Sequence, residues 1–308
     1  MVPRRAVTTT SHDCLRRKCP FYGTTCFVHG ARRFAETADV VVTNHTLLFC
    51  DAAADNGLLP PVRHWILDEA HGAEAEARRA FSLEIAAEDV TRLAQKVASG
   101  ESRNVYARAE RKLSSSLKND GATLFEGLIG KAKSAGDMFA AAAHGFAPHI
   151  KDLLYFDPNK RSRSYDRTEL WLNDDIRASE TFGSLRTLAK AMQVSAEKAI
   201  TCSQELVGYL ENIEGAAEPQ REIASVAMDL KDLVGAVEVI FGEKSDSYAY
   251  AAELCRKKDK QTDKLEALVV NVGEALEDKL YSQTKSVVFA SATLSFDGDF
   301  TSFENAMG

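Results

Sequence analysis

The sequence lacks a long hydrophobic run. No stretch of its 308 residues approaches the ~18 consecutive apolar residues that a membrane-spanning helix needs. Its first residues are basic where the hydrophobic segment of a secretory signal would lie. The composition, 45% hydrophobic and 27% charged, is typical of a globular protein, and the length suffices for about two domains. We therefore expect a cytoplasmic protein with no membrane partner.

Two catalytic motifs are also missing. The sequence has no G-x-x-x-x-G-K-[ST] loop, whose backbone would cradle the phosphates of a nucleotide. It has no H-E-x-x-H or similar pair of metal ligands either, which weakens the hypothesis of a free-standing metal hydrolase. No internal repeat or low-complexity tract stands out.

Charge is distributed unevenly along the chain, whose formal net charge is −7. Residues 1–33 contain seven Lys and Arg side chains and one acid, whereas the rest of the chain contains 31 basic and 44 acidic side chains. A basic segment on an acidic body can concentrate a polyanion locally. An ordinary solvated cluster of charges explains the same pattern equally well.

Six cysteines are present, and three of them, Cys14, Cys19 and Cys26, fall within 13 residues. In a reducing compartment such a cluster favours metal binding over disulfides, with buried free thiols as the alternative. Four-iron clusters take four thiolates, and zinc takes four ligands with closer cysteine pairs. The sequence alone leaves open which metal, if any, is bound.

Three short apolar runs predict buried parallel strands: Asp39–Thr43, His64–Leu67 leading into Asp68, and Ser286–Ala290. Leu268–Val272 is a weaker fourth candidate. Each of the three runs ends in small or polar residues, as strands do where they deliver functional groups to the carboxyl edge of an α/β sheet.

More than two hundred residues between the second and third runs are mostly helical in pattern. We expect an antiparallel helical hairpin across the Gly215- and Pro219-containing linker Glu214–Gln220, and a short strand within Tyr165–Leu172. An insertion of this length is a separate helical domain whose ends meet on the sheet. Its apolar stripes are Val90, Leu93, Ala94 and Val97; Leu124, Leu128, Ala132, Ala135, Met138 and Phe139; Leu185, Leu188, Met192, Ala196, Ala199, Leu206, Leu210 and Ile213; and Ile223, Val226, Leu230, Val234, Val237 and Phe241.

The most informative stretch is the apolar run that ends in Asp68-Glu69-Ala70-His71. Adjacent acids at the end of a buried strand form the Walker B arrangement. Asp68 is suited to hold Mg²⁺, because hard cations prefer carboxylate oxygen. Glu69 is then suited to orient or deprotonate the water that attacks the γ-phosphate of ATP. A bare acid pair would more often be two surface residues that open a helix.

Ser291-Ala292-Thr293 directly follows the third apolar run. Small hydroxyl residues at the end of a strand can hydrogen-bond the acids of the neighbouring strand. Alone, the tripeptide would more often be a turn or a helix cap.

Together these motifs resemble helicase superfamily 2, and the surrounding sequence resembles the DinG/XPD-like iron–sulfur DNA helicases, the DinG branch in particular. The resemblance lies in content and order: the three cysteines, Val41-Val42-Thr43-Asn44-His45, Asp68–His71, a long helical insertion, then Ser291–Thr293. It covers about a third of the chain by motif, and the helical middle by position only.

The resemblance implies an α/β protein with a partial RecA-like parallel sheet and a large inserted, mainly α-helical Arch-like domain. It implies ATP, Mg²⁺ and a [4Fe–4S] cluster as cofactors, with Cys14, Cys19 and Cys26 as ligands and the fourth upstream. His71 would be catalytic with the two acids, and Ser291, Ala292 and Thr293 would couple hydrolysis to motion. The implied domains are a partial cluster segment (1–36), motor domain 1 with its acidic box (37–80), the insertion (81–265), and the return to motor domain 1 (266–308).

The expected activity is ATP-driven 5′→3′ unwinding or translocation of the kind used in DNA repair or replication, and its polarity rests on the resemblance alone. Single-stranded or forked DNA would contact Arg16, Arg17, Lys18, Asn44 and His45, with aromatic residues interleaved among the basic ones. Because the phosphate loop and a second motor domain are missing, we expect an internal segment with negligible ATP turnover alone. The alternative is a metal-stapled DNA- or protein-binding module without a motor.

Overall fold

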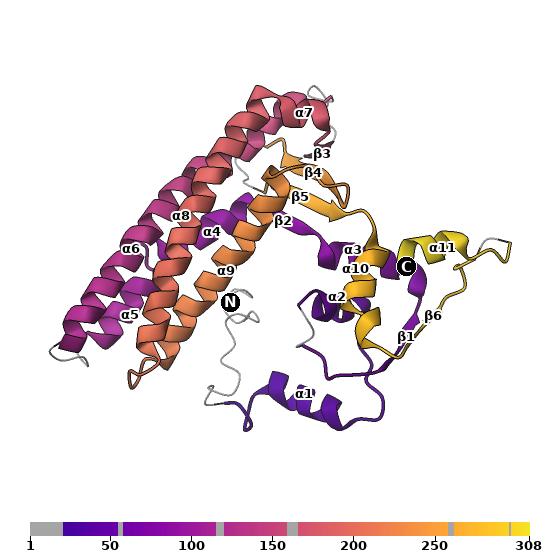
Figure 1. The fold of residues 1–308 in the computed structure, drawn as a ribbon, viewed down its shortest axis with the longest axis horizontal. Helices are drawn as coiled ribbons and strands as arrows, with labels where there is room; N and C mark the ends of the chain where they lie inside the picture. The colour runs from indigo at the N-terminus through magenta and orange to yellow at the C-terminus, as the bar shows by residue number, and fades with distance from the viewer. Residues whose placement is uncertain (1–20, 55–57, 115–119, 159–165, 258–261, 296) are drawn as a thin grey trace. The chain divides into compact units, whose positions relative to one another are not determined.

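The computed structural model describes residues 21–54, 58–114, 120–158, 166–257, 262–295 and 297–308 (Figure 1). These residues form two compact units. Unit 1 comprises the described parts of Glu84–Lys244 and Tyr250–Glu266. Unit 2 comprises the described part of Pro20–Leu83, with Ser245–Ala249 and Ala267–Gly308.

Unit 2 is built on a pair of parallel strands, β1 (His64–Asp68) and β6 (Ser286–Ala290). Both strands coincide with apolar runs of the sequence, so these two predicted strands and their parallel pairing are confirmed. Their predicted burial is wrong, because Leu67 is the only buried residue of β1 and β6 has none. The other elements of unit 2 are helices that precede or follow these two strands in the sequence (Figure 1). They are α1 (Phe27–Thr37), α2 (His45–Ala53), η3 (Ala70–Gly72), α3 (Ala73–Phe81), α10 (Val272–Lys279), η5 (Tyr281–Gln283) and α11 (Thr301–Met307).

The core of unit 2 forms where one face of this strand pair meets α2, α3 and α10. Leu67 of β1 is 2% exposed, and the buried alanines of α3 belong to the same core, where they allow α2 and α10 to approach closely because they have no side chain beyond Cβ. Tyr281 packs at the edge of this core and donates its hydroxyl to the carbonyl oxygen of Met307 at 2.7 Å. Burial raises the pKa of Tyr281 to about 12, with the Glu277 carboxylate as a further cause. The phenol therefore stays neutral and keeps this hydrogen bond.

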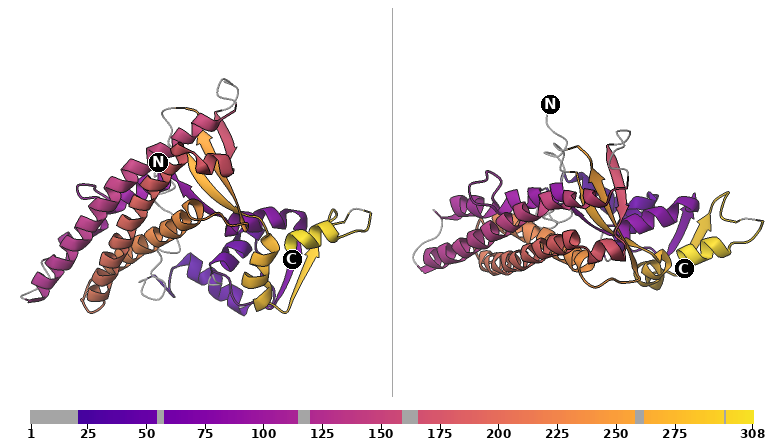
Figure 2. Two further views of the ribbon diagram at one scale, coloured as in Figure 1. Left: turned by 45° about the horizontal axis from the view of Figure 1, so that its top comes forward. Right: turned by 90° about the horizontal axis from the view of Figure 1, so that it is seen from above.

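Unit 1 is mainly helical, and its long helices α6, α8 and α9 lie side by side (Figures 1 and 2). Both α6 and α9 pack against α8, which is therefore the central helix of the three. The elements of this unit are α4 (Ala87–Val97), α5 (Val105–Leu113), α6 (Asp120–Phe146), η4 (Ala147–Phe156), α7 (Asp174–Ala178), α8 (Glu180–Leu210) and α9 (Ala217–Phe241), with the strands described below.

Helix α8 starts where its sequence provides a cap. The hydroxyl of Ser179 accepts the backbone N–H of Phe182 at 3.2 Å, which satisfies one of the free donors of the first turn. The helix then buries a continuous stripe from Leu185 to Leu210. A short linker, in which Gly215 adopts φ +78°, leads into α9. The predicted antiparallel hairpin is therefore confirmed.

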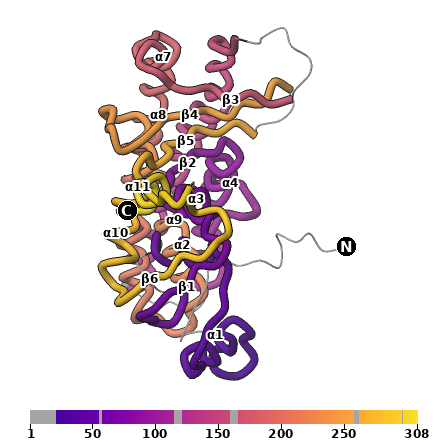
Figure 3. Tube along the Cα trace, turned by 90° about the vertical axis from the view of Figure 1, so that its right-hand side faces the viewer, coloured from indigo at the N-terminus to yellow at the C-terminus, as the bar shows by residue number. Residues whose placement is uncertain are grey.

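A second sheet carries strands in the order β2-β5-β4-β3 (Figure 3). The edge strand β3 pairs antiparallel with β4, as the register Arg167–Cys255 to Trp171–Ala251 shows. Strand β3 lies inside Tyr165–Leu172, which confirms the short strand predicted there. The four strands are β2 (Leu83–Ala86), β3 (Arg167–Trp171), β4 (Tyr248–Cys255) and β5 (Lys264–Val269).

Two predictions about elements are wrong. Residues 39–43 form no strand in the described chain; Val40 and Val42 are 79% and 93% exposed. The run has the composition of a buried strand, but a strand also needs a partner for its backbone groups, and none of the described segments pairs with it. The fourth candidate, 268–272, is divided between the end of β5 and the start of α10.

The apolar stripe predicted for α6 is also partly wrong, because Leu124 and Met138 are 55% and 49% exposed. Its other members Ala132, Ala135 and Phe139 are buried as predicted, and Phe125 and Ile129 join them on the buried face. Within the described residues, no helix is both long and apolar enough to cross a membrane.

Candidate functional site

The acidic turn and the Ser-Ala-Thr turn meet at one edge of the parallel strand pair. The register aligns His64 with Ser286 and Asp68 with Ala290, so both strands end together. His64 Nδ1 and Ser286 Oγ lie 2.8 Å apart at the starting edge, which holds this register. Residues separated by about 220 positions in the chain are therefore neighbours at the carboxyl edge of the sheet.

The acidic turn, Asp68–His71, directs three side chains outward and one inward. Asp68, Glu69 and His71 are exposed, whereas Ala70 is completely buried in the core beneath them. One carboxylate oxygen of Asp68 accepts the backbone N–H of Glu69 at 3.0 Å, which leaves its other oxygen directed away from this contact. An exposed carboxylate at this edge fits the oxygen ligand that Mg²⁺ prefers.

Glu69 adopts the left-handed backbone conformation, with φ 51° and ψ 43°. This conformation costs a residue with a Cβ roughly 1–2 kcal/mol, so the surrounding structure must hold it there. Two buried residues hold it in this conformation: Leu67 fixes the end of the strand in the core, and Ala70 fixes the helical turn that follows.

His71 links the two turns. Its Nδ1 lies 3.3 Å from the Glu69 carboxylate and 3.1 Å from the hydroxyl of Ser291, and its side chain is 56% exposed. A proton on Nδ1 would let His71 donate to the Glu69 carboxylate, and the same N–H would also lie within hydrogen-bonding distance of the Ser291 hydroxyl oxygen. Ala292 and Thr293 follow in an exposed turn. Because His71 contacts both side chains, a movement of Glu69 can alter the hydrogen bond between His71 and Ser291.

The predicted DNA contacts are divided by what the structure describes. Asn44 caps α2, since its side-chain oxygen accepts the N–H of Leu47 at 2.8 Å. His45 is the first residue of that helix, and its ring lies 6.2 Å from the Phe49 ring. Their capping and packing account for both residues structurally, which leaves a DNA contact as a proposal. Arg16, Arg17 and Lys18 lie outside the described residues.

Of the three clustered cysteines, Cys26 is described, whereas Cys14 and Cys19 lie outside the described residues. The Cys26 sulfur accepts the N–H of His29 at 3.4 Å and so caps α1. The His29 ring stacks on Tyr22 with ring centroids 3.6 Å apart. Among the residues that can be assessed, no group of three or more His, Cys, Asp or Glu side chains is placed to hold a metal ion.

The face of the strand pair opposite the core carries exposed apolar side chains. Ile66 and Val288 are register partners in the middle of the two strands, and they are 76% and 51% exposed. Parallel strands are normally covered on both faces. This uncovered apolar pair is therefore unusual for a complete parallel sheet.

Two polar contacts around α3 were not anticipated from the sequence. Thr46 of α2 donates to the Glu76 carboxylate at 2.6 Å, and Arg78 contacts backbone carbonyls 191 and 192 residues further along the chain. The only hint in the sequence is the i,i+4 spacing of Glu74 and Arg78, which predicts a helical ion pair and nothing more.

Comparison with curated proteins gives consistent relatives, although no protein-family model matches the chain. The "3'-5' exonuclease DinG" of Bacillus subtilis is 27% identical over 285 residues, which are 89% of this chain and 29% of that protein. The "ATP-dependent helicase DinG" of Mycobacterium tuberculosis is 44% identical over 96 residues, 28% of this chain and 14% of that protein. The "ATP-dependent DNA helicase YoaA" of Escherichia coli is 36% identical over 95 residues, 30% of this chain and 15% of that protein.

The chain spans less than a third of the length of each of these relatives. Most of it nevertheless aligns with one of them, and the shorter matches have higher identity. The acidic turn and the Ser-Ala-Thr turn on paired parallel strands are consistent with that relationship. This chain is therefore similar to the DinG and YoaA proteins, in one case over most of its length.

Proposed function

We propose that the chain is part of an ATP-dependent DNA helicase that translocates 5′→3′ on single-stranded DNA. In this proposal unit 2 contributes part of a RecA-like motor domain, and unit 1 is an inserted Arch-like domain. The observation that carries the proposal is the parallel register of β1 and β6, which brings Asp68, Glu69 and Ser291 to one edge. The names of the DinG and YoaA relatives support an ATP-dependent helicase activity, whereas the polarity rests on the resemblance alone.

Each residue of the edge has a role in the proposed hydrolysis. Asp68 would hold Mg²⁺, which neutralises the phosphate charge of ATP when bound. Glu69 would orient the attacking water and accept its proton. His71 would report the state of Glu69 to Ser291 through the nitrogen that lies near both side chains. Ala292 and Thr293 would transmit that state along the turn.

The exposed apolar pair Ile66 and Val288 supports the proposal that further motor strands or helices cover this sheet. The resemblance to the iron–sulfur helicases supports a [4Fe–4S] cluster held by Cys14, Cys19, Cys26 and a fourth thiolate. Cys26 fits such a role in being a free thiol at a helix start. No step of the proposed hydrolysis depends on the cluster.

The test compares the complete reading frame that contains this sequence with the 308-residue chain. We expect ATP hydrolysis stimulated by single-stranded DNA in the complete protein, and negligible hydrolysis by the chain alone. Glu69→Gln should lower turnover by about 100-fold or more, because it removes the proposed base but keeps the shape. Glu126→Gln, an exposed position on α6, is the matched control and should leave turnover unchanged.

Unwinding of partial duplexes with a 5′ or a 3′ single-stranded tail tests the polarity. Hydrolysis by the 308-residue chain that Glu69→Gln abolishes would contradict the expectation that it is inactive alone. DNA binding by a complete protein that never hydrolyses ATP would support the alternative of a metal-stapled binding module. Because the Bacillus subtilis relative is named an exonuclease, release of nucleotides from a labelled strand should be measured in parallel.

A further inference from the structure

Helix α3 sets the position of the acidic turn, because it begins two residues after His71. Ala70 and the first residue of the helix, Ala73, are both completely buried, and so is Ala77 one turn later. Because these side chains are small and completely buried, the backbone of the helix packs directly against the core. A shift of α3 would therefore displace Glu69 and His71.

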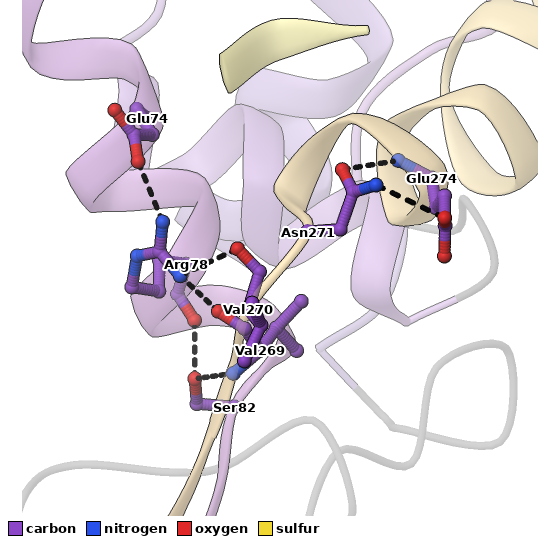
Figure 4. A network of polar contacts seen from close by, with 7 residues as sticks. All are labelled: Glu74, Arg78, Ser82, Val269, Val270, Asn271 and Glu274. Atoms are coloured by element: carbon purple, nitrogen blue, oxygen red, sulfur yellow. Dashed lines mark hydrogen bonds and ion pairs between the residues drawn. The ribbon is translucent and has the colours of Figure 1, made fainter. Parts of the chain in front are cut away.

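The last turn of α3 is tied to a distant segment of unit 2 by Arg78 (Figure 4). One arm of its guanidinium, Nη1, donates to the carbonyl oxygens of Val269 and Val270, the second at 3.0 Å. The other arm, Nη2, donates to the Glu74 carboxylate at 2.5 Å. The side chain is 32% exposed, so water screens these contacts only in part.

Ser82 completes the connection. Its hydroxyl donates to the carbonyl oxygen of Arg78 at 2.6 Å and accepts the backbone N–H of Val269 at 3.2 Å (Figure 4). We call these contacts of Arg78 and Ser82 with Glu74, Val269 and Val270 the clasp. Next to it, Asn271 caps α10 by accepting the N–H of Glu274 at 3.3 Å, which fixes the segment that the clasp holds.

The clasp lies where the chain connects the two units. Ser82 directly precedes β2, and the chain passes from unit 2 into unit 1 after Leu83. Val269 is the last residue of β5, and the chain has returned to unit 2 from Ala267 onward. The segment that leads into unit 1 and the segment that returns from it are therefore both hydrogen-bonded at the C-terminal end of α3, the helix that follows the acidic turn.

Arginine suits this position better than lysine. Its planar guanidinium presents five N–H donors in a fixed fork, so it can serve two carbonyl groups and a carboxylate at once. A lysine ammonium is a compact charge that cannot span the same three acceptors from one side chain.

We propose that Arg78 is a positioning residue for the acidic turn. Its clasp fixes α3, and with it Glu69 and His71, against the segments that lead into and out of unit 1. A load on those segments then reaches the acidic turn through α3. The role assigned to the turn rests on the proposed function, whereas the clasp itself does not.

The first test measures amide hydrogen exchange in the 308-residue chain. In Arg78→Gln, peptides covering 68–77 should exchange about tenfold faster or more, because α3 loses the charge-assisted bonds that hold its end. Arg78→Lys should give an intermediate rate. Arg79→Gln is the matched control: Arg79 is the next residue, its side chain is 79% exposed, and it pairs only with Glu76, at 3.4 Å, in the contacts described.

Equal exchange rates of residues 68–77 in Arg78→Gln and Arg79→Gln would overturn the clasp. So would acceleration that is equal throughout unit 2, since that would indicate general loss of stability. If Arg78→Gln does not fold, Ser82→Ala removes the acceptor for Val269 with less disturbance, and the same comparison decides.

The second test uses the complete protein. Arg78→Lys should lower kcat for ATP about tenfold and leave KM within twofold, as expected of a residue that positions the turn without touching nucleotide. An equal loss in Arg79→Lys would overturn the positioning role. Absence of hydrolysis in the unaltered complete protein would reject the proposed function and leave the exchange result to judge the clasp.

Discussion

At the scale of single residues, Gly136 on α6 shows how closely the helices of unit 1 pack. A Cβ added there would lie 2.6 Å from the carbonyl oxygen of Val97 and 3.0 Å from the Tyr106 ring. Backbone oxygen cannot move aside as a flexible side chain can. Gly136→Ala should therefore reduce the free energy of unfolding of unit 1 by about 1–3 kcal/mol, measured by urea unfolding.

Gly130, on the same helix, is the matched control because nothing lies within 4 Å of the place its Cβ would take. Gly130→Ala should stabilise the chain by about 0.5–1 kcal/mol through the better helix propensity of alanine. If both substitutions change the free energy of unfolding in the same direction, Gly136 is not required for close packing of the helices.

Residues with chemistry were easier to recognise from the sequence than residues that position them. Asp68, Glu69 and Ser291 stand out because acids and hydroxyls follow apolar runs, and the structure brings them together at one edge. Arg78 gives no comparable signal, since its partners are backbone carbonyls that any residue could supply. Only the folded chain shows which carbonyls lie within its reach.

At the scale of elements, an apolar run by itself determines neither a strand nor burial, since Val42, Ile66 and Val288 are all exposed. The runs at 64–68 and 286–290 are strands because each provides the other with backbone partners. The similar run at 39–43 has no such partner among the described segments, and Val40 and Val42 are exposed. Pairing is a property of two segments, so one segment's composition cannot determine it.

The stripe predicted for α6 is partly wrong for a different reason. Leu124 and Phe125 are adjacent, as are Leu128 and Ile129, so spacing of three and four residues fits more than one face. The face that is buried carries the rings of Phe125 and Phe139, with Ile129 between them. Which face wins depends on α4 and α8, which pack on it.

Arg177 joins three elements of unit 1. It is 7% exposed, and it donates to the carbonyl oxygens of Ile240 at 2.9 Å and Gly242 at 3.1 Å, where α9 ends. Its guanidinium also lies 4.4 Å from the Tyr250 ring centroid and 5.2 Å from that of Phe182. Burial lowers the pKa of Arg177 from its ordinary value, but an arginine remains charged at neutral pH.

Arg177→Met keeps much of the volume but leaves the two carbonyl groups without this donor. We expect a loss of about 2–4 kcal/mol in the free energy of unfolding, because hydrogen bonds to a charged, buried group are the stronger ones. Circular dichroism during urea unfolding measures it. Arg92→Met is the control: its side chain is 45% exposed, and the substitution should change the free energy of unfolding by less than about 1 kcal/mol. A similar loss at both positions would mean that the buried hydrogen bonds of Arg177 do not stabilise unit 1.

At the scale of the whole molecule, charge is the property that connects the sequence to the proposed DNA partner. The acidic body repels a polyanion, so binding would have to depend on the basic residues near the start of the chain. Electrostatic binding to single strands weakens with salt in proportion to the number of phosphates neutralised, with a slope of about 0.7 per contact. The slope therefore counts contacts, whatever the affinity.

Substituting Arg16, Arg17 and Lys18 together by alanine should lower the salt slope for a labelled oligothymidine by about 2, since three contacts at about 0.7 each are lost. Fluorescence anisotropy at several salt concentrations measures the slope. The control carries the same loss of charge at exposed sites of unit 1, Arg92, Lys131 and Lys231 to alanine, and should keep the slope. An equal reduction in the control would mean that overall charge, and not the basic segment, governs binding. A slope near zero in the unaltered chain would exclude electrostatic capture of DNA by these residues.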